Sequence, residues 1–289
     1  MSKFFTADKL SGRVTRIGGQ AHELCYLIEG DERALLIDGL TGIGSLKAFV
    51  RDLTDKPVQL ALTHGHLDHT GAAWEYGAAY IHPDDIALMY TDRFSSDEVR
   101  YQHVFNRNAN STVQRSDVMP NCAIKTWPLL EGDVFDLGGV QLEAILVPGH
   151  THGSMVFLDR AARVLYSGDA CNVNTLVCLP GSTSIEEYLE SLQHFKTFQP
   201  DFDVMYGGHG MEPIPNTIID DAIAMCHRIL DGTDEHVAVP SLTGETAYLG
   251  SARSPRYLPV CGGYANIMYS DRMLHRTPAS RVIRDEPII

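Results

Sequence analysis

The sequence has no apolar run that approaches the roughly 20 residues of a membrane-spanning helix. Its first ten residues, Met1 to Leu10, lack the basic-then-apolar pattern of a secretion signal. The six cysteines are widely scattered and do not form the dense framework of a small secreted domain, so we expect free thiols. These absences lead us to expect a cytoplasmic protein that makes no contact with a membrane.

Positive charge is scarce as well. Lys and Arg number 23 against 37 Asp and Glu, which gives a net charge of 23 − 37 = −14. A surface of this charge repels a polyanion, so we expect a small-molecule substrate and no nucleic-acid partner. The hydrophobic share of 44% is ordinary for a globular protein.

No internal repeat, low-complexity stretch or flexible linker divides the 289 residues. We therefore expect a single domain over residues 1–289. Residues 92–127 have a weak, polar pattern that indicates an insertion, and residues 237–289, rich in Pro and Gly, indicate a C-terminal extension.

Short apolar runs alternate with amphipathic stretches along the chain. The clearest helix spans residues 184–198, where Ile185, Tyr188, Leu192 and Phe195 share one face. Further helices are predicted at 45–53, 70–76, 84–90 and 217–230, and strands at 13–17, 23–28, 34–37, 58–62, 142–147, 155–158, 164–166, 203–206 and 264–269. Strands that alternate with helices, together with hairpins, favour an α/β sandwich with mixed sheets.

The strongest chemical signal follows the strand predicted at 58–62. It is the segment Thr63-His64-Gly65-His66-Leu67-Asp68-His69, with four metal-ligating side chains within six residues. Clustered imidazoles and a carboxylate at this spacing are rare in an ordinary polar loop and typical of a metal site. Gly65 permits a tight turn between two imidazoles, so one loop can serve two adjacent ions.

Three later residues fit the same interpretation. His150, Asp169 and His209 each come just after an apolar strand and next to a glycine. Any one of them alone is more typical of a loop. Metal-ligating residues that follow four different strands are a stronger signal, and we expect their side chains to meet at one site.

On these motifs the chain resembles the metallo-β-lactamase superfamily over roughly Val14 to His209. The resemblance implies a four-layer αββα sandwich with two mixed β-sheets and a metal site at the sheet edges. It also implies that His64, His66 and His150 hold one ion, that Asp68, His69 and His209 hold a second, and that Asp169 bridges both. Asp68 is then also the catalytic residue that carries a proton to the leaving group.

Two divalent ions at such a site lower the pKa of a shared water, and the resulting hydroxide attacks an electrophilic carbonyl or phosphorus. Zinc is the default for imidazole and carboxylate ligands, and iron and manganese are also suited to them. We therefore expect a metal-dependent hydrolase that acts on a small ester, lactone or thioester.

Departures from the known branches narrow this expectation. Zinc β-lactamases are secreted and lack an Asp at the position of Asp169, so a true β-lactamase is disfavoured. Glyoxalase II carries a basic residue in the loop after its bridging Asp, whereas no Lys or Arg occurs here between Val164 and Phe195. Acyl-homoserine lactonases have a tyrosine where this chain has Asn172. A mononuclear iron persulfide dioxygenase, a phosphodiesterase and a non-catalytic metal-binding module remain alternatives.

Three residues are candidates for substrate contacts. His22 lies in a loop that can overhang the metal site in this fold, Asn172 follows Asp169, and Leu176 belongs to an apolar stretch suited to an acyl group. We expect residues 92–127 and the C-terminal extension either to cover the site or to form the interface of a homodimer.

Overall fold

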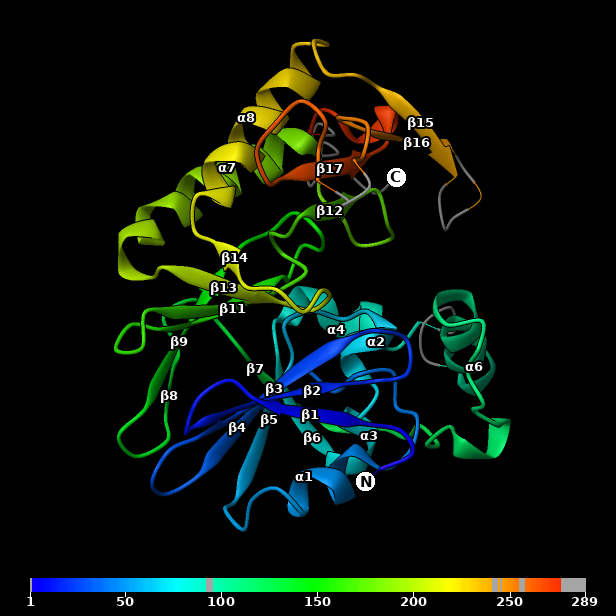
Figure 1. The fold of residues 1–289 in the computed structure, drawn as a ribbon, viewed down its shortest axis with the longest axis vertical. Helices are drawn as coiled ribbons and strands as arrows, with labels where there is room; N and C mark the ends of the chain where they lie inside the picture. The colour runs from blue at the N-terminus through cyan, green and yellow to red at the C-terminus, as the bar shows by residue number, and fades with distance from the viewer. Residues whose placement is uncertain (1, 92–95, 241–243, 245, 255–257, 277–289) are drawn as a thin grey trace, which may run out of the picture.

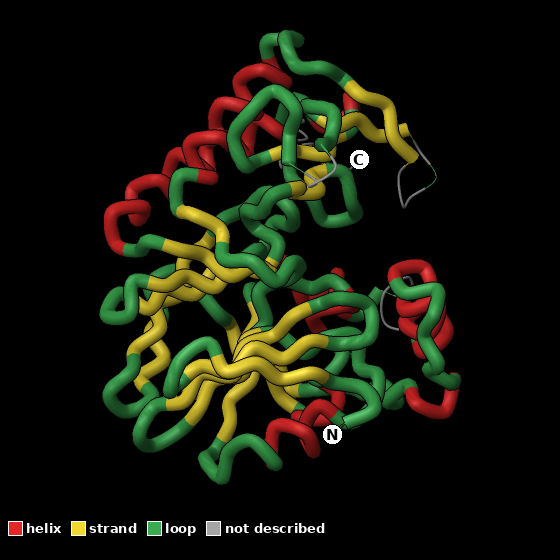
Figure 2. Tube along the Cα trace, viewed as in Figure 1, coloured by secondary structure: helices red, strands yellow, loops and turns green. Residues whose placement is uncertain are grey.

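The computed structural model describes residues 2–91, 96–240, 244, 246–254 and 258–276 (Figures 1 and 2). Within these ranges, no helix is both long enough and apolar enough to cross a membrane. The strands lie mainly in the interior and most helices lie outside them (Figure 2).

The first sheet is built by the N-terminal part of the chain and is mixed. Its seven strands follow sequence order: β1 (Thr6–Lys9), β2 (Val14–Gly18), β3 (Leu24–Glu29), β4 (Ala34–Ile37), β5 (Val58–Ala61), β6 (Ala78–Ile81) and β7 (Lys125–Pro128). The strands from β1 to β4 pair antiparallel, and those from β4 to β7 pair parallel. All residues of β4 are buried, as expected for a strand covered on both faces.

The second sheet is also mixed. It has the order β14-β13-β11-β10-β9-β8, with β8 at Val134–Asp136, β9 at Gln141–Leu146, β10 at Met155–Asp159, β11 at Val164–Gly168, β13 at Val204–Gly207 and β14 at Ile214–Pro215. Tyr26 and Ile37 of the first sheet share one buried cluster with Leu142 and Phe157 of the second. The two sheets therefore pack face to face.

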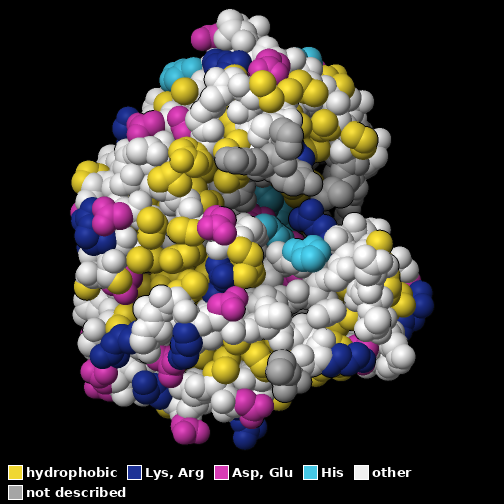
Figure 3. All heavy atoms as spheres, in the orientation of Figure 1, with side chains coloured by type: hydrophobic (Ala, Val, Ile, Leu, Met, Phe, Trp, Pro, Cys, Tyr) yellow, Lys and Arg dark blue, Asp and Glu magenta, His cyan; other side chains and the backbone are white. Residues whose placement is uncertain are grey.

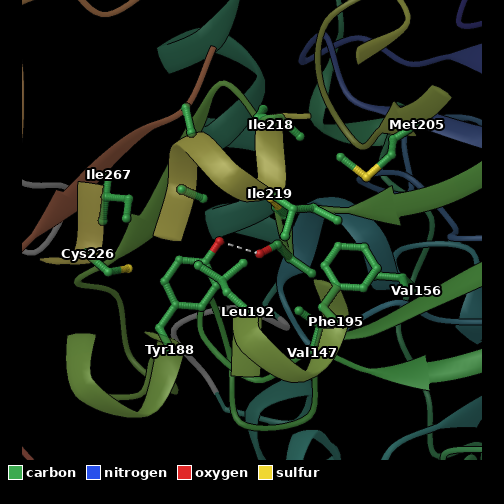
Figure 4. Packing of buried hydrophobic residues seen from close by; sticks show 14 of the residues in the cluster. Val147, Val156, Tyr188, Leu192, Phe195, Met205, Ile218, Ile219, Cys226 and Ile267 are labelled. Carbon is green, nitrogen blue, oxygen red and sulfur yellow. Dashed lines mark hydrogen bonds between the residues drawn. The ribbon is translucent and has the colours of Figure 1, made fainter. Parts of the chain in front are cut away.

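Helices cover the outer face of each sheet. Against the first sheet pack α1 (Leu46–Arg51), α3 (Ala73–Tyr76) and α4 (Pro83–Met89). Against the second pack α7 (Ile185–Phe195) and α8 (Ile218–Leu230), where Tyr188, Leu192 and Phe195 meet Ile218 and Ile219 (Figure 4). The helix–sheet–sheet–helix order confirms the predicted αββα sandwich, and the predicted face of α7 is buried.

A third sheet adds to the two expected from the sequence. It has four strands in the order β12 (Asn174–Val177), β17 (Asn266–Tyr269), β16 (Thr246–Leu249) and β15 (Val237–Pro240). The parallel pair β12 and β17 joins the loop after Asp169 to the C-terminal segment. The segment predicted as an extension is thus partly a sheet, and it lies next to α7 and α8 (Figure 1).

The segment predicted as an insertion contains both regular structure and a strand of the first sheet. Helix α6 spans Asp97–Arg107 and begins at the N-cap Ser96, while β7 occupies the edge of the sheet. Only Arg100 and Val104 of α6 are buried, which explains the weak hydrophobic pattern. The expectations for residues 92–95, 241–243, 245, 255–257 and 277–289 lie outside the described residues.

The helix predicted at 70–76 is a different element in the structure. It is divided into α2 (Leu67–Thr70) and α3, with Gly71 and Ala72 between them. A Cβ on Gly71 would lie 2.1 Å from the Gly42 nitrogen, so only glycine lets the chain pass this close to that segment. Asp68 and His69 lie within the single turn of α2. The remaining short elements are the 3₁₀ helices η1 (Arg115–Asp117), η2 (Lys196–Asp201) and η3 (Asp271–Met273).

Candidate metal centre

The segment 63–69 starts just beyond the carboxyl end of β5 and runs into α2. His64 and His66 precede the helix, with His66 at its N-cap position, while Asp68 and His69 lie inside it. The need for glycine at position 65 comes from packing, because a Cβ there would lie 2.6 Å from the Asp85 carbonyl oxygen of α4. The close approach of α4 holds the two imidazoles on either side of Gly65 in place.

The other three predicted residues arrive from the second sheet. His150 follows β9, Asp169 follows β11 and His209 follows β13, and all three lie beside the residues of the 63–69 segment. Three sets have ligand atoms within 4.8 Å of one another: His64 with His66 and His150, His64 with His69 and Asp169, and Asp68 with His69 and His209. The structure therefore brings together all seven residues that the sequence singled out.

Asp169 lies between the two histidine groups. Its Oδ2 is 3.8 Å from His150 Nε2 on one side, and 3.7 Å from His69 Nε2 and 3.4 Å from His209 Nε2 on the other. Asp68 belongs to one side only, with its Oδ2 3.4 Å from His209 Nε2. A carboxylate placed like Asp169 can contact two adjacent ions, and one placed like Asp68 can contact one.

Each histidine is oriented by a bond from one ring nitrogen to the protein. Nδ1 of His69 donates to Asp38 (2.9 Å), Nδ1 of His150 donates to the Leu176 carbonyl (2.8 Å), and Nδ1 of His64 lies 3.0 Å from Thr63 Oγ1. Because Thr63 Oγ1 donates its own proton to Asp38, it accepts from His64. Such bonds orient these three rings so that Nε2 faces the cluster, where it can offer a lone pair to a cation.

His66 and His209 are also oriented by the protein, but His66 turns Nδ1 toward the cluster. His66 points Nε2 at the Pro180 carbonyl (3.3 Å) and Nδ1 toward His150 Nε2, at 2.9 Å. His209 directs Nδ1 to the His22 carbonyl at 3.4 Å. Two ring nitrogens in such close contact suit a shared cation, because each can then offer a lone pair.

Several buried atoms of the cluster have no hydrogen-bond partner among the described residues. They are Nε2 of His64, His69, His103 and His209, and Oδ1 of Asp169. Buried polar atoms without a partner are costly, so a group of them that converges on one point needs an explanation. Imidazole nitrogens and carboxylate oxygens are the donors that divalent transition metals prefer, and the residues present fit such ions.

The electrostatics of the cluster agree with a cation site. Burial lowers the pKa of His64 and His150, and it lowers the pKa of His66 to about 3, so these rings are neutral. Burial disfavours charge on His209 too, but Asp169 and Asp68 outweigh it and raise the His209 pKa to about 10. The two carboxylates therefore require positive charge beside them, which a metal ion supplies in place of the proton.

The cluster lies where two cavities adjoin. The first, of about 330 Å³, has the apolar residues Leu67, Val99, Leu176, Leu179 and Pro180 in its lining. The second, of about 670 Å³, is lined by residues 172–174 and 210–215 and by part of the C-terminal segment. Arg107, Asp169, Leu176 and His209 line both. Figure 3 shows histidine side chains in a hollow, next to Lys or Arg side chains.

The three predicted substrate contacts have different outcomes. Leu176 lines both cavities, and Asn172 lines the second. The side chain of His22 is exposed and lies outside the lining of either cavity, and its carbonyl is what contacts His209. His22 adopts a positive φ of 64°, which is uncommon for a residue other than glycine.

Sequence reasoning missed several residues of the site. His103 on α6 places Nε2 3.5 Å from Asp68 Oδ2. Asp38 orients His69 and Thr63. Asp85 accepts from the nitrogens of Gly65 and Gly153 and from the Thr151 hydroxyl, so it ties the 63–69 segment to the His150 loop. Asp38 follows a buried strand, and that was the one signal available for it.

Comparison with protein families agrees with this geometry. The model of the metallo-beta-lactamase superfamily matches residues 18–209, which is more than half of the chain. The chain belongs to this superfamily. The match ends at His209, the last residue of the cluster in the chain, and leaves the C-terminal segment outside.

Individual relatives are distant. The chain is 22% identical to the human acyl-coenzyme A thioesterase MBLAC2 over 241 residues, which are 79% of this chain and 74% of the relative. It is 23% identical over 202 residues to the probable polyketide biosynthesis zinc-dependent hydrolase PksB of Bacillus subtilis (68% and 77%). A solved metallo-beta-lactamase from Pontibacter korlensis has the same fold, with a TM-score of 0.56 at 16% identity over 77% of this chain and 99% of that one. We assign the chain to the metal-dependent hydrolases of the superfamily.

Proposed function

We propose that the protein hydrolyses acyl thioesters with the aid of two divalent ions, most simply zinc. The observation that carries the proposal is the position of the cluster at the junction of two cavities. A thioester has two arms on either side of the reacting carbonyl, the acyl chain and the leaving thiol. A lactone has no separate leaving group, so a site with two arms favours an ester or thioester.

The first cavity suits the acyl arm. Leu67, Leu176 and Leu179 line it close to His66 and His150, so an acyl chain there would be in apolar surroundings with its carbonyl at the cluster. Helix α6 supplies Val99 to the same cavity. Volumes of about 330 and 670 Å³ lie in the usual range of about 300–1,000 Å³ for small-molecule sites.

His64, His66 and His150 would hold one ion, Asp68, His69 and His209 the other, and Asp169 would contact both. Ions bound there lower the pKa of water and polarise a carbonyl. Asp68 has a second role in this proposal. Burial alone would raise its pKa, but His69, His103 and His209 outweigh burial and lower it, so the carboxylate is ionised. Its Oδ2 can accept a proton and pass it to the leaving sulfur.

Two relatives support the choice of substrate and metal. One carries the name acyl-coenzyme A thioesterase and another the name zinc-dependent hydrolase. At identities of 22% and 23% these names indicate a class of chemistry, and the substrate needs a direct test.

The test begins with the metal content of protein purified without added metal, measured by elemental mass spectrometry. Hydrolysis of acyl-N-acetylcysteamine thioesters is then compared with that of simple esters, lactones and phosphodiesters. We expect close to two ions per chain and the highest kcat/KM for thioesters. A single iron per chain together with oxygen consumption on glutathione persulfide would instead establish the dioxygenase, and a preference for phosphodiesters would likewise refute the proposal.

The variant Asp169→Asn tests the bridging role. It should lower the metal content and the rate together, because it removes the carboxylate that reaches both histidine groups. The matched control is Asp203→Asn, an exposed carboxylate that pairs with Arg163 and should keep both values. Full metal content and full rate in the Asp169 variant would contradict the ligand assignment.

A further inference from the structure

The second cavity carries two arginines in a protein with a net charge of −14. Arg107 comes from the last turn of α6, and Arg253 comes from the C-terminal segment. The two are far apart in sequence, and neither lies in the loop after Asp169, where the sequence has no basic residue. Helix α6 and the C-terminal segment, which contribute little to the metal cluster, thus bring positive charge to one cavity beside it.

The Arg107 guanidinium is available for a ligand. It is exposed, and no described residue forms an ion pair or a hydrogen bond with its side chain. Its position at the C-terminus of α6 is favourable for a cation because of the helix dipole. Arg107 also lines both cavities, so it lies close to the point where the leaving group separates from the acyl chain.

Arg253 is held in place by the third sheet. Its Nε donates to Asn174 Oδ1 at 3.0 Å, and Asn174 is the first residue of β12. This bond anchors the Arg253 side chain to the third sheet beside the cavity that it lines. Arginine in this arrangement can bind a carboxylate or a phosphate through two parallel N–H groups.

The remaining groups of the second cavity are mostly neutral. Asn172, Asn174 and Tyr264 offer amide and hydroxyl groups, while Val173, Met211, Leu258 and residues 213–215 are apolar. Glu212 is the opposing charge: it is exposed and lies next to Met211 in the lining. Asp169 and His209 belong to the metal cluster. Among the described residues that line this cavity outside the cluster, two arginines therefore face one glutamate.

We propose that Arg107 and Arg253 bind an anionic group, phosphate or carboxylate, on the leaving thiol of the substrate. The proposal rests on the proposed thioesterase function, because it assigns the second cavity to the leaving arm. The thiols that fit are large and polar with terminal anions. Coenzyme A offers phosphates and glutathione offers carboxylates, and both share the chemistry that an arginine pair recognises.

Binding is tested first without catalysis, by calorimetry of the metal-loaded protein with two thioethers that cannot be hydrolysed, S-methyl-coenzyme A and S-methylglutathione. We expect at least one of them to bind, and the tighter one identifies the source of the anion. Arg107→Gln and Arg253→Gln should each raise its Kd about tenfold, which corresponds to about 1.4 kcal/mol. Unchanged Kd values in both variants, or no binding of either compound to the wild type, would overturn the proposal.

Kinetics then separate a charge effect from a general loss of function. For the acyl thioester of the preferred thiol, both variants should raise KM about tenfold, while KM and kcat for the uncharged acyl-N-acetylcysteamine stay within twofold. An equal loss on both substrates would show that the arginines do not act on the anion. The control is Arg33→Gln, an exposed arginine at the end of β4 opposite to the metal cluster, which should behave as the wild type.

The two proposals fail in different ways. If the wild type hydrolyses the uncharged thioester and the arginine variants bind both thioethers normally, the thioesterase stands and the anion site is refuted. If no thioester is hydrolysed but thioether binding depends on both arginines, the anion site stands and the proposed reaction is refuted.

Discussion

Replacing Asp85 is the sharpest test of how the metal cluster is supported, because this residue is buried and is not a ligand. Its carboxylate accepts from Gly65 N (2.7 Å), Gly153 N (2.8 Å) and Thr151 Oγ1 (2.8 Å). The Thr151 hydroxyl keeps a second partner in Ser154, so Asp85→Ala leaves two main-chain N–H groups unsatisfied. Each costs about 1–3 kcal/mol when buried.

The two unsatisfied N–H groups together cost about 2–6 kcal/mol. The net loss of stability is smaller, because the substitution also removes a carboxylate whose burial is unfavourable. Burial raises the Asp85 pKa despite the three hydrogen bonds, so the site disfavours the charge that the substitution removes. We expect Asp85→Ala to lower the free energy of unfolding by about 3 kcal/mol. Asp85→Asn keeps one acceptor oxygen, and its loss should be about half as large.

The assay is urea unfolding of the metal-free variants, followed by titration of the folded protein with zinc. Because Gly65 lies between His64 and His66, loosening the segment should also weaken zinc affinity by about 10- to 100-fold, as is usual for partners that orient ligands. The matched control is Asp84→Asn, the exposed neighbour on the same helix turn. An Asp85→Ala protein no less stable than this control would refute the reasoning.

Three further predictions follow from the geometry. Gly208→Ala should weaken zinc binding at least tenfold, because a Cβ there would lie 2.6 Å from His69 Cε1. The control is Gly207→Ala, whose Cβ would have no atom nearer than 3.4 Å and which should bind zinc normally in the same titration. The Glu98 carboxyl should titrate near pH 2 by NMR, because its hydrogen bonds from Arg115 lower its pKa to about 2. A depressed pKa means that this ion pair stabilises the fold above about pH 4.5 and is lost as the pH falls toward 2, and Arg115→Gln should return the midpoint toward 4.5. Tyr188→Phe should lower the free energy of unfolding by about 1 kcal/mol in urea, since the buried hydroxyl donates to the Ala170 carbonyl; no loss would contradict that bond's contribution.

The sequence was sufficient to find the candidate ligands because each follows an apolar strand. The carboxyl ends of β5, β11 and β13 meet at one edge of the sandwich, so residues placed after them converge without any knowledge of their contacts. The same reasoning could not find His103. Its helix buries only Arg100 and Val104, and nothing in the pattern of α6 indicates what its other residues face.

The third sheet was missed for a different reason. Of its strands only β17 was predicted, at 264–269, while β12, β15 and β16 have four residues each, too short to show an alternating pattern, and β12 pairs with β17 about 90 residues later in the chain. Pairing across that separation depends on the rest of the fold, which brings the two segments together. Leu176 was nevertheless predicted as a contact because its apolar side chain follows Asp169 closely in sequence.

Helix α6 supplies most of the wall of the first cavity that is not made of ligands, and the C-terminal segment adds Arg253, Leu258 and Tyr264 to the second. A metal cluster requires particular side chains at fixed positions, so its signature persists as a motif that a family model detects. A cavity wall requires only volume, polarity and charge, which many sequences satisfy. Arg107 lies inside the matched range but outside its motifs, and Arg253 lies beyond residue 209 where the match ends. Substrate choice should therefore change with residues 97–107 and with Arg253, Leu258 and Tyr264 while the seven cluster residues stay the same. Exchanging these residues for a relative's should change the preferred thiol without lowering the metal content.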